Sequence, residues 1–293
     1  MHKSGFVNII GNPNVGKSTL MNALVGEKLS IITSKAQTTR HRIMGIVSGE
    51  DFQIVYSDTP GILKPSYKLQ ESMMKFVTGA VTDADVILYV TDTVEQGDRS
   101  AEIIGRIRES GIPTVVVINK IDLSTPEALD ALVDKWRQEL PEAQIVPASA
   151  KENFNIEGLF KTILALLPEG PAFYPKETLT DKTLRFFASE IIREKILKFY
   201  DKEIPYCCEI EIDSYREEPT IDRIAATIYV ARDSQKGILI GHKGEKLKRV
   251  GQAAREDMEQ FLGKKVFLQL FVKVNDDWRN NERQLRRFGY ELE

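Results

Sequence analysis

Long apolar runs are missing from this 293-residue sequence. The longest ones, at 86–90 and 115–118, have the length of a β-strand, whereas a helix needs roughly 20 apolar residues to span a bilayer. A secretory signal is not expected either, because cleavage after residues 1–10 would damage the glycine-rich loop that follows. These absences argue against a membrane-spanning or secreted protein.

Cysteine is scarce as well, with only two residues, Cys207 and Cys208, which are adjacent. Neighbouring side chains of a strand point to opposite faces, so we expect one cysteine in the core, the other on the surface, and no bond between them. So few cysteines indicate a reducing compartment, and we expect a cytoplasmic protein.

The net charge of −3 gives no sign of a polyanionic partner, but the local charge is uneven. Residues 232–255 hold seven basic and two acidic side chains, and residues 279–287 hold four basic and one acidic. Local basic patches bind polyanions even when the total charge does not favour it.

Strand-like and helix-like stretches alternate over the first half of the chain. Strands are expected where the runs FVNIIG, DFQIVYSD, VILYVTD, TVVVIN and AQIVP occur, and helices are expected at 16–26, 98–110, 126–140 and 155–167. This alternation predicts an α/β domain with a mostly parallel sheet and helices on both faces. Ligands of such sheets bind at the carboxyl ends of the strands.

Three prolines and a glycine between 166 and 181 interrupt this pattern and indicate a linker. After it the expected order is helix, strand, strand, helix, helix, strand, helix, which predicts a small α+β domain with three strands and helices on one face. We therefore place the first domain at 1–170, the linker at 171–181 and the second domain at 182–293.

The sequence GNPNVGKS at 11–18 fits the phosphate-binding pattern G-x-x-x-x-G-K-[ST] between a strand and a helix. Gly11 and Gly16 allow a tight turn whose N–H groups face phosphate oxygens, and the helix adds its positive end. Lys17 can neutralise the β- and γ-phosphates, and the Ser18 hydroxyl can bind Mg²⁺. The motif predicts a nucleotide bound together with magnesium.

Two later motifs complete this nucleotide site. In DTPG (58–61), Asp58 ends a strand and can hold Mg²⁺, and Gly61 can offer its N–H to the γ-phosphate. In NKID (119–122), the Asp122 carboxylate can accept hydrogen bonds from guanine N1 and N2, which adenine cannot donate. Each hydrogen bond to a charged group contributes roughly 1.5–3 kcal/mol, so Asp122 predicts a preference for guanine.

The loops around these motifs supply further candidates. Asn119 can brace its loop, and the Lys120 stem can lie over the purine. In SAK (149–151) the Ala150 N–H could face guanine O6, although so short a sequence is common. The expected nucleotide-binding residues are Gly11, Asn14, Val15, Gly16, Lys17, Ser18, Thr19, Asp58, Gly61, Asn119, Lys120, Asp122, Ser149, Ala150 and Lys151.

In this order the motifs resemble the translation-factor-like GTPases, with QTTR (37–40) as a fifth element, over residues 5–167. The resemblance implies a P-loop GTPase fold and a threonine that closes over the γ-phosphate and Mg²⁺. Thr39 is the better candidate and Thr38 the alternative, while Arg40 is either an internal arginine finger or an exposed basic residue. The implied metal ligands are Ser18, Thr39 and Asp58.

Ile62 departs from the Ras-like pattern, in which a glutamine after the DxxG motif orients the attacking water. An alkyl side chain cannot do so. Related GTPases with a hydrophobic residue here use K⁺ held partly by an asparagine of the phosphate loop, and Asn14 matches that position; alternatively, Asn14 braces the loop. The implied catalytic residues are Lys17, Thr39, Gly61 and Asn14.

A second glycine-flanked loop lies in ILIGHKGEKLK at 238–248. It is similar to the KH motif, I-G-x-x-G followed by a hydrophobic residue and lysine, and its surroundings resemble the type II arrangement. KH domains clamp the backbone of about four nucleotides with this loop. The alternative is a basic loop that caps a helix on a solvated face. The expected RNA-binding residues are Gly241, His242, Lys243, Gly244, Lys246, Lys248 and Arg249.

Together, a GTPase domain and a C-terminal KH domain in a chain of this length resemble the bacterial Era family of GTPases. The resemblance implies a GTP-hydrolysing switch that binds the 3′ end of small-subunit ribosomal RNA, assists assembly of the small ribosomal subunit, and has a peripheral association with the inner membrane. The basic helix expected at 277–288 could contact RNA, contact the membrane, or be solvated.

Three readings of the function remain open at the level of sequence. In the first, GTP orders residues 33–41 and 58–75 through the γ-phosphate, and hydrolysis releases them and switches RNA binding. In the second, nucleotide occupancy gates binding and turnover is incidental. In the third, the GTPase acts on membranes. We expect GTP or GDP and Mg²⁺ as ligands, with K⁺ as a hypothesis, and a monomer.

Overall fold

The computed structural model describes residues 2–94 and 100–290. Its contacts divide the chain into two compact units, Met1–Ser66 with Gln70–Asp181, and Tyr67–Leu69 with Lys182–Glu293. No helix within 2–94 or 100–290 is both long and apolar enough to cross a membrane.

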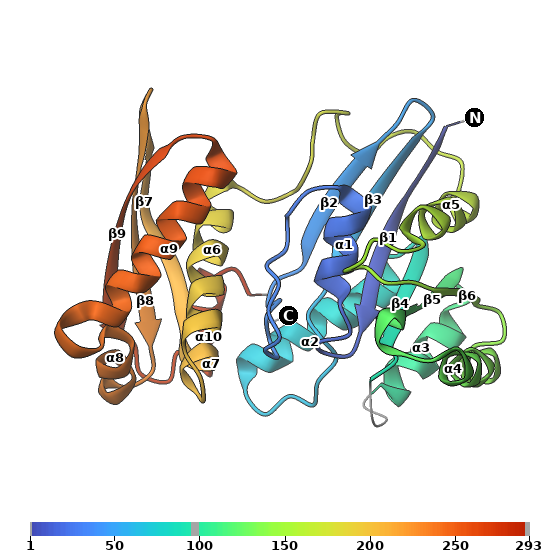
Figure 1. The fold of residues 1–293 in the computed structure, drawn as a ribbon, viewed down its shortest axis with the longest axis horizontal. Coiled ribbons are helices and arrows are strands. Elements are labelled where there is room, and N and C mark those ends of the chain that lie inside the picture. The colour runs from blue at the N-terminus through green and yellow to red at the C-terminus, as the bar shows by residue number, and fades with distance from the viewer. Residues whose placement is uncertain (1, 95–99, 291–293) are drawn as a thin grey trace. The chain divides into compact units, whose positions relative to one another are not determined.

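The first unit is built on a six-stranded sheet with the order β2-β3-β1-β4-β5-β6 (Figure 1). All pairs are parallel except β2 with β3, so the prediction of a mostly parallel sheet is confirmed. The strands are β1 Lys3–Gly11, β2 Ile43–Ser48, β3 Phe52–Asp58, β4 Val86–Asp92, β5 Thr114–Asn119 and β6 Gln144–Pro147. The helices are α1 Lys17–Val25, α2 Lys68–Thr82, α3 Ala101–Ser110, α4 Pro126–Glu139 and α5 Ile156–Leu166.

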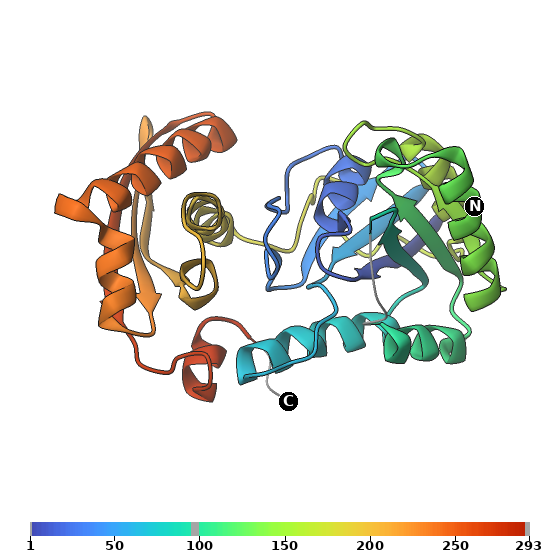
Figure 2. The same cartoon turned by 60° about the horizontal axis from the view of Figure 1, so that its bottom comes forward.

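Helices cover both faces of this sheet. Figure 2 shows α2 and α3 on one side of the strands and α1 on the other. Every residue of β4 and of β5 is buried, as expected for central parallel strands. The helix predicted at 98–110 is α3, although residues 98 and 99 lie outside the described part of the chain. Strand β2 and helix α2 were not expected from the sequence.

The segment expected to act as a linker lies along the first unit. Glu169 and Thr180 form single bridges with Lys3 and Gly45. The buried Gln53 side chain accepts hydrogen bonds from the N–H groups of residues 173 and 174 at 2.7 and 2.9 Å, and it donates one to the carbonyl of residue 174 at 2.8 Å. The proline-rich segment is therefore held by hydrogen bonds to the strands β1, β2 and β3.

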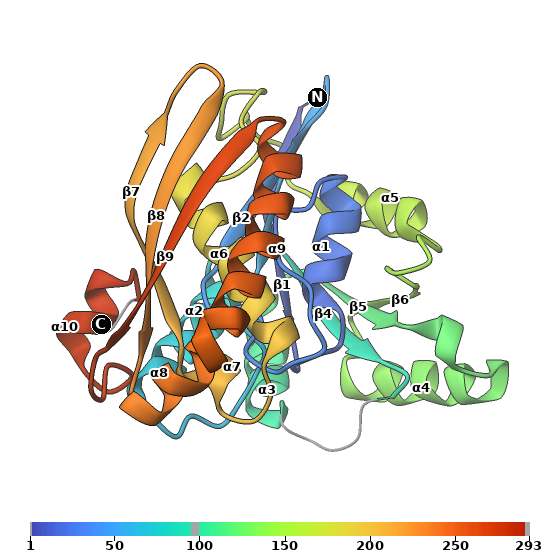
Figure 3. The same cartoon turned by 60° about the vertical axis from the view of Figure 1, so that its left-hand side comes forward.

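The second unit has a three-stranded sheet with the order β7-β8-β9 (Figure 3). Its strands are β7 Glu209–Glu217, β8 Ile221–Val230 and β9 Lys265–Val274, and its helices are α6 Leu184–Phe199, α7 Ile204–Cys207, α8 Asp233–Ile240, α9 Glu245–Leu262 and α10 Glu282–Arg287. Strand β8 is antiparallel to β7 and parallel to β9. Figure 1 shows α6 and α9 on the same side of the strands, which confirms the predicted α+β domain. The expectation of helices on one face holds for α6 and α9, whereas Arg287 of α10 contacts Glu211 on the opposite face.

Two expectations for this unit were wrong. Both cysteines are buried. Cys207 is the last residue of the short helix α7 and Cys208 is its C-cap, so the pair does not lie within a strand. The Sγ atoms of both lie within 3.4 Å of the Ile204 carbonyl oxygen. The C-terminal helix extends over six residues, and most of the rest of 277–288 consists of turns.

Candidate functional site

The phosphate loop connects β1 to α1, as the sequence predicted. Gly11 and Gly16 have φ of +157° and +96°, which side-chain-bearing residues rarely adopt. The buried Lys17 ammonium donates to the carbonyls of Gly11 and Asn12 at 3.0 and 2.8 Å. The lysine therefore lies folded over the loop, where it could neutralise phosphates.

Three expected metal ligands converge beside this loop. The Ser18 hydroxyl donates to Asp58 Oδ2 at 2.7 Å and lies 2.9 Å from the Thr39 hydroxyl, and Thr39 Oγ1 lies 3.4 Å from the same carboxylate. Asp58 is fully buried, and among the described residues its Oδ1 atom has no hydrogen-bond partner. Hydroxyl and carboxylate oxygens are ligands that Mg²⁺ prefers, so these residues fit the metal.

The electrostatics of Asp58 support the same interpretation. Burial raises the pKa of its carboxyl above the ordinary value of 3.8, and the Ser18 hydrogen bond and the Lys17 charge oppose that shift. A buried carboxylate with an unused oxygen is costly unless a cation accompanies it.

The two candidate threonines and Arg40 differ in where their side chains lie. Thr38 points away from the cluster, because its hydroxyl donates to the Lys35 carbonyl at 2.5 Å and lies 2.6 Å from Thr33 Oγ1. Arg40 is 1% exposed, so the expectation of an exposed basic residue is wrong. It follows Thr39, which is also buried.

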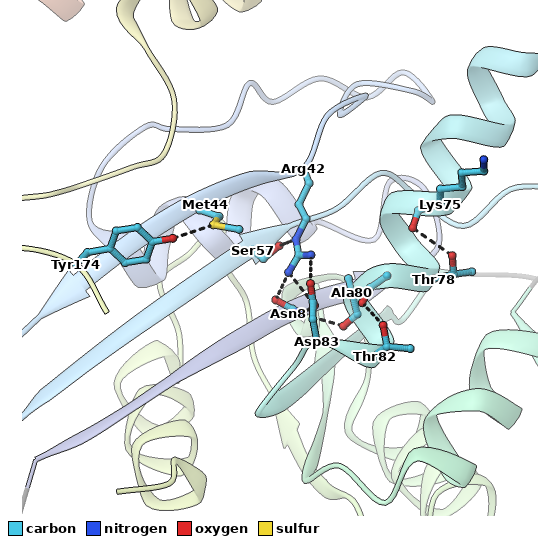
Figure 4. Close-up of polar contacts among 11 residues, drawn as sticks. Asn8, Arg42, Met44, Ser57, Lys75, Thr78, Ala80, Thr82, Asp83 and Tyr174 are labelled. Carbon is cyan, nitrogen blue, oxygen red and sulfur yellow. Dashed lines mark hydrogen bonds and ion pairs between the residues drawn. The ribbon is translucent and has the colours of Figure 1, made fainter. Parts of the chain in front are cut away.

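Arg42 fixes the end of this segment to the sheet and to α2 (Figure 4). Its guanidinium donates to Ser57 Oγ at 2.5 Å, to Asn8 Oδ1 at 3.0 Å and to both carboxylate oxygens of Asp83 at 2.5 and 3.0 Å. Asn8 in turn donates to Asp83 and to the Ala80 carbonyl. The cluster connects the end of the threonine segment with the end of α2, and no sequence motif indicated it.

Gly61 and Ile62 follow β3 beside the phosphate loop. A Cβ atom on Gly61 would lie 2.8 Å from Pro13, so only glycine fits this approach. Ile62 is buried in the core beneath α2 and α3, and its side chain is not available to a water molecule. Asn14 has φ of +65° and an exposed side chain.

Asn119 joins three of the motifs. Its Nδ2 group donates to the Val15 carbonyl at 2.8 Å, and its Oδ1 atom accepts from the Ala150 N–H at 3.0 Å. A Cβ atom on Gly16 would lie 2.2 Å from this Nδ2 group, so the contact depends on glycine. The Ala150 N–H that was expected to face guanine O6 therefore bonds to a side chain of the protein here.

The remaining guanine-side residues lie at the same edge of the sheet. The Lys120 ammonium donates to the Asn14 carbonyl at 2.6 Å and pairs with Asp92 at 2.5 Å. The exposed Asp122 accepts a 2.6 Å hydrogen bond from Ser149, which orients its carboxylate. Lys151 is exposed and pairs with its neighbour Glu152.

A pocket of about 430 Å³ lies over the phosphate loop. The predicted residues that line it are Asn14, Gly16, Lys17, Ser18, Thr19, Thr39, Gly61, Lys120 and Lys151. The lining also includes Thr33, Ser34, Lys35, Gln37 and Thr38 of the segment 33–41 that GTP is expected to order. Sequence reasoning missed Ile31 and Ile32, which precede that segment in an irregular loop without a periodic pattern.

The second loop connects α8 to α9. Gly241, Lys243 and Gly244 have φ of +73°, +47° and +82°. His242 and Lys243 are exposed at its tip, and so are the side chains that follow on α9, namely Lys246, Lys248 and Arg249. The Arg249 guanidinium lies 4.4 Å from the centre of the Phe199 ring. The loop could hold phosphates against its backbone.

A groove of about 570 Å³ lies beside this loop, between α9 and β9. Besides Gly244 and Lys248 it is lined by Leu247, Gly251, Gln252, Arg255, Leu268 and Leu270. Gln252 and Arg255 follow Lys248 at helical spacing, which is the signal that could have identified them. Apolar walls with polar side chains at the rim suit an unstacked base.

Comparisons with known proteins match both domains. A family model described as "50S ribosome-binding GTPase" matches residues 6–120, and one described as "KH domain" matches residues 203–279. GTPase Era of Alkaliphilus metalliredigens (strain QYMF) is 46% identical over 295 residues, which cover 99% of each chain. GTPase Era of Staphylococcus haemolyticus (strain JCSC1435) is 45% identical over 291 residues, which cover 99% of this chain and 97% of the relative.

Two solved structures are similar over the whole chain. One is Era in complex with MgGDPNP and nucleotides 1506–1542 of 16S ribosomal RNA, with a TM-score of 0.95, 41% identity and coverage of 100% of both chains. The other is a variant of Aquifex aeolicus Era bound to GDP and AlF₄⁻, with a TM-score of 0.95, 41% identity and coverage of 99% of this chain and 100% of that one.

Proposed function

The chain belongs to the Era family of GTPases, and from this premise we propose that it is a GTP-dependent switch that acts on ribosomal RNA. The observation that carries the proposal is that one edge of the first sheet gathers the groups for the phosphates, Mg²⁺ and guanine, while a separate unit carries the glycine-flanked basic loop. Lys17 would neutralise the phosphates, and Ser18, Thr39 and Asp58 would hold Mg²⁺, which supplies positive charge to the transferring phosphoryl group.

The guanine side of the proposal rests on the anchored carboxylate of Asp122. Ser149 holds one of its oxygens, and Asn119 fixes the adjoining loops to the phosphate loop. Asp122 would accept from guanine N1 and N2, and Lys120 would cover the purine. Purified protein should hydrolyse GTP in the presence of Mg²⁺ and leave ATP unchanged; equal turnover of both nucleotides would refute this assignment.

K⁺ is the second component that we propose for hydrolysis. Ile62 is buried and cannot orient water, so hydrolysis must use another group, and K⁺ would add positive charge where Ras relatives receive an arginine from a partner. Asn14 lies on the lining of the nucleotide pocket, and its side chain would contribute an oxygen ligand to K⁺.

For the second unit we propose binding of single-stranded RNA at the 3′ end of small-subunit ribosomal RNA. Support comes from the Era structure that holds nucleotides 1506–1542 of 16S ribosomal RNA and from the exposed basic side chains around Gly241 and Gly244. The binding residues would be Gly241, His242, Lys243, Gly244, Lys246, Lys248 and Arg249, with the domains at 1–170 and 182–293 connected by 171–181. We propose further that the chain assists assembly of the small ribosomal subunit as a cytoplasmic monomer with peripheral contact at the inner membrane.

Charge reversal at the loop tip tests RNA binding. The double variant His242→Asp/Lys243→Asp should lose most of its affinity for the RNA of nucleotides 1506–1542 in a fluorescence anisotropy titration, because two carboxylates would face phosphates. The matched control is Arg106→Asp/Arg137→Asp, which reverses two exposed charges on α3 and α4. Equal loss in both variants would show that only the total charge matters and would overturn the proposed site.

Whether turnover itself matters can be separated from nucleotide occupancy. A variant of Asn14 that still binds GTP but hydrolyses it slowly should fail to support assembly if the chain acts as an enzyme. Full support by that variant would favour the reading in which GTP occupancy alone gates RNA binding.

A further inference from the structure

The outward face of the second sheet carries two exposed aromatic rings. On β9, Val266, Leu268 and Leu270 point into the core that α6 and α9 cover. Phe267 and Phe271 alternate with them, point to the opposite face, and are 43% and 50% exposed. Two large aromatic side chains on one exposed strand face suggest a binding surface, because such residues are usually buried.

Basic side chains flank the two rings. Lys265 and Lys273, the first and the ninth residue of β9, are exposed on the same face. Arg223 lies opposite Phe267 in the register of β8 and β9, with its guanidinium carbon 5.4 Å from the ring centre, and Arg216 pairs with Arg223 across β7 and β8. We call Arg216, Arg223, Lys265, Phe267, Phe271 and Lys273 the outer aromatic face.

Acidic groups do not cancel this charge. Glu218 pairs with Arg223 at 3.0 Å, but both side chains are more than 40% exposed, so the pair is weak and open to exchange. Asp213 accepts a hydrogen bond from Thr227 at 2.8 Å on the β7 side. Lys265 also lies 3.5 Å from Glu259, but 74% of its side chain is exposed. The four basic side chains thus outnumber Glu218 and Asp213 on this side of the sheet, and the excess of positive charge suits a polyanion.

The C-terminal segment packs against one part of this side of the sheet. The Arg287 guanidinium contacts Glu211, and the Phe288 ring packs 5.5 Å from the ring of Tyr229. Tyr229 of β8 lies opposite Lys273 of β9 in the sheet register. The contacts of the C-terminal segment are therefore near the end of β9 that is farther from Phe267. The C-terminal segment thus leaves Phe267 exposed and covers the neighbouring end.

The outer aromatic face and the groove of the second unit share one strand. Leu268 and Leu270 line the groove on one side of β9, and Phe267 and Phe271 stand on its other side. Strand β9 is also an edge strand, so no further strand separates the two surfaces. A chain that leaves the groove can pass over this edge onto the rings.

We propose that the outer aromatic face binds single-stranded RNA by stacking bases on Phe267 and Phe271 while Arg216, Arg223, Lys265 and Lys273 contact phosphates. This inference rests on the RNA binding proposed above and extends it from the groove to the opposite side of β9. Stacking on aromatic rings is tolerant of sequence, because every base has a π-face. The outer aromatic face therefore raises the affinity for RNA and lengthens the bound RNA segment, while the groove determines which bases are preferred.

The spacing of the rings predicts a dependence on RNA length. Residues four apart on a β-strand are separated by about 13 Å. An RNA chain that reaches both rings must therefore continue several nucleotides beyond the groove. An RNA that fills only the groove, about four to six nucleotides long, would not reach the face, and one of about 12 nucleotides would.

Substitution of both rings tests the proposal in the full-length chain. Phe267→Leu/Phe271→Leu keeps apolar bulk but removes the π-faces, and it should weaken binding of a 12-nucleotide fluorescent RNA by about tenfold or more. Binding of the matching six-nucleotide RNA should be unchanged. Phe267→Tyr/Phe271→Tyr should restore the affinity, and Phe261→Leu, which alters a ring of 44% exposure elsewhere in the second unit, should have no effect.

The outcomes separate this inference from the function on which it rests. If the leucine double variant binds both RNAs as the unchanged chain does, the outer aromatic face is not an RNA surface, and a protein partner becomes the explanation for the exposed rings. If the long RNA binds no more tightly than the short one to the unchanged chain, the inference also fails. Failure of the proposed RNA site at the glycine-flanked loop would have a different result. In that case His242→Asp/Lys243→Asp would leave the affinities for the 12-nucleotide and the six-nucleotide RNA unchanged.

Discussion

Asn119 Nδ2 donates a 2.8 Å hydrogen bond to the Val15 carbonyl oxygen, which lies 104 residues earlier in the chain. With its other amide atom the same side chain accepts from the Ala150 N–H. One buried amide thus fixes the phosphate loop and two guanine-side loops relative to one another. The affinity for the nucleotide should depend on this amide even if it never contacts the ligand.

Asn119→Ala should weaken GDP binding by about 10- to 100-fold, because each buried group left without a partner costs about 1–3 kcal/mol. Titration with a fluorescent GDP analogue measures the effect. Gln138→Ala removes an exposed amide on α4 and serves as the matched control. An Asn119 variant with unchanged affinity would show that the loops hold their positions without the amide.

Asp122→Asn should reverse the preference for the base. Guanine offers an amino group at C2, where xanthine offers a carbonyl oxygen, and an asparagine amide can donate to that oxygen. GTP affinity should fall by about a factor of ten or more for each lost charge-assisted hydrogen bond, and XTP should become the better ligand. Competition between GDP and XDP for the fluorescent analogue decides the matter, with the unchanged chain as reference.

Turnover of GTP should be faster in K⁺ than in Na⁺ at equal ionic strength, because Asn14 would hold K⁺ where an arginine acts in other GTPases. Asn14→Ala should remove the difference between the two salts while nucleotide affinity stays within about a factor of three, less than the loss of one hydrogen bond would cause. Phosphate release under saturating GTP is the measurement. Equal rates of the unchanged chain in both salts would contradict the role of K⁺.

Magnesium binding should weaken at a higher pH than it would for an exposed carboxylate. Burial raises the pKa of Asp58 above 3.8, so as the pH falls through that raised pKa, protons compete with Mg²⁺ for the carboxylate. Above that pKa the carboxylate is ionised and available to the metal. Asp58→Asn should lower Mg²⁺-dependent GTP affinity and reduce the loss of Mg²⁺ affinity on acidification, as Mg²⁺ titrations of both proteins at falling pH would show; the same pH dependence in both would contradict the assignment, because the γ-phosphate alone would then account for it.

Gln53→Ala should destabilise the first unit by about 2–5 kcal/mol, because its removal leaves the N–H groups of residues 173 and 174 without their acceptor. Urea unfolding measures the change, and Gln138→Ala again serves as the control. If the two variants unfold alike, the proline-rich segment is not held by this side chain.

The order and spacing of the motifs made the nucleotide site largely predictable. GNPNVGKS, DTPG and NKID each follow a strand, and parallel strands bring their carboxyl ends to one edge. Thr39 could be preferred over Thr38 from the motif, but which hydroxyl turns toward Asp58 depends on the path of an irregular loop. Arg40 shows the limit of such reasoning, because an arginine in a polar loop is usually exposed and this one is buried.

In the second unit the local sequence patterns predicted helices and strands as well as in the first unit. They were less informative about which face of a strand is buried. The alternation in KVFLQLFVKV predicts a strand, yet both of its faces carry large apolar residues, so the sequence cannot say which one the helices cover. The cysteine pair failed for a related reason. A short helix replaced the expected start of a strand there, and residues at the end of a helix need not point to opposite sides.

By itself the sequence determined the two domain types and the position of the basic loop, and it predicted the guanine nucleotide and the magnesium ligands, because each of these rests on short motifs of neighbouring residues. Only the tertiary structure decided which distant side chains meet: Asn119 with Val15, Arg42 with Asp83, and the exposure of Phe267 and Phe271. Such contacts depend on how whole elements pack, and packing energy is shared among many residues that no local pattern encodes.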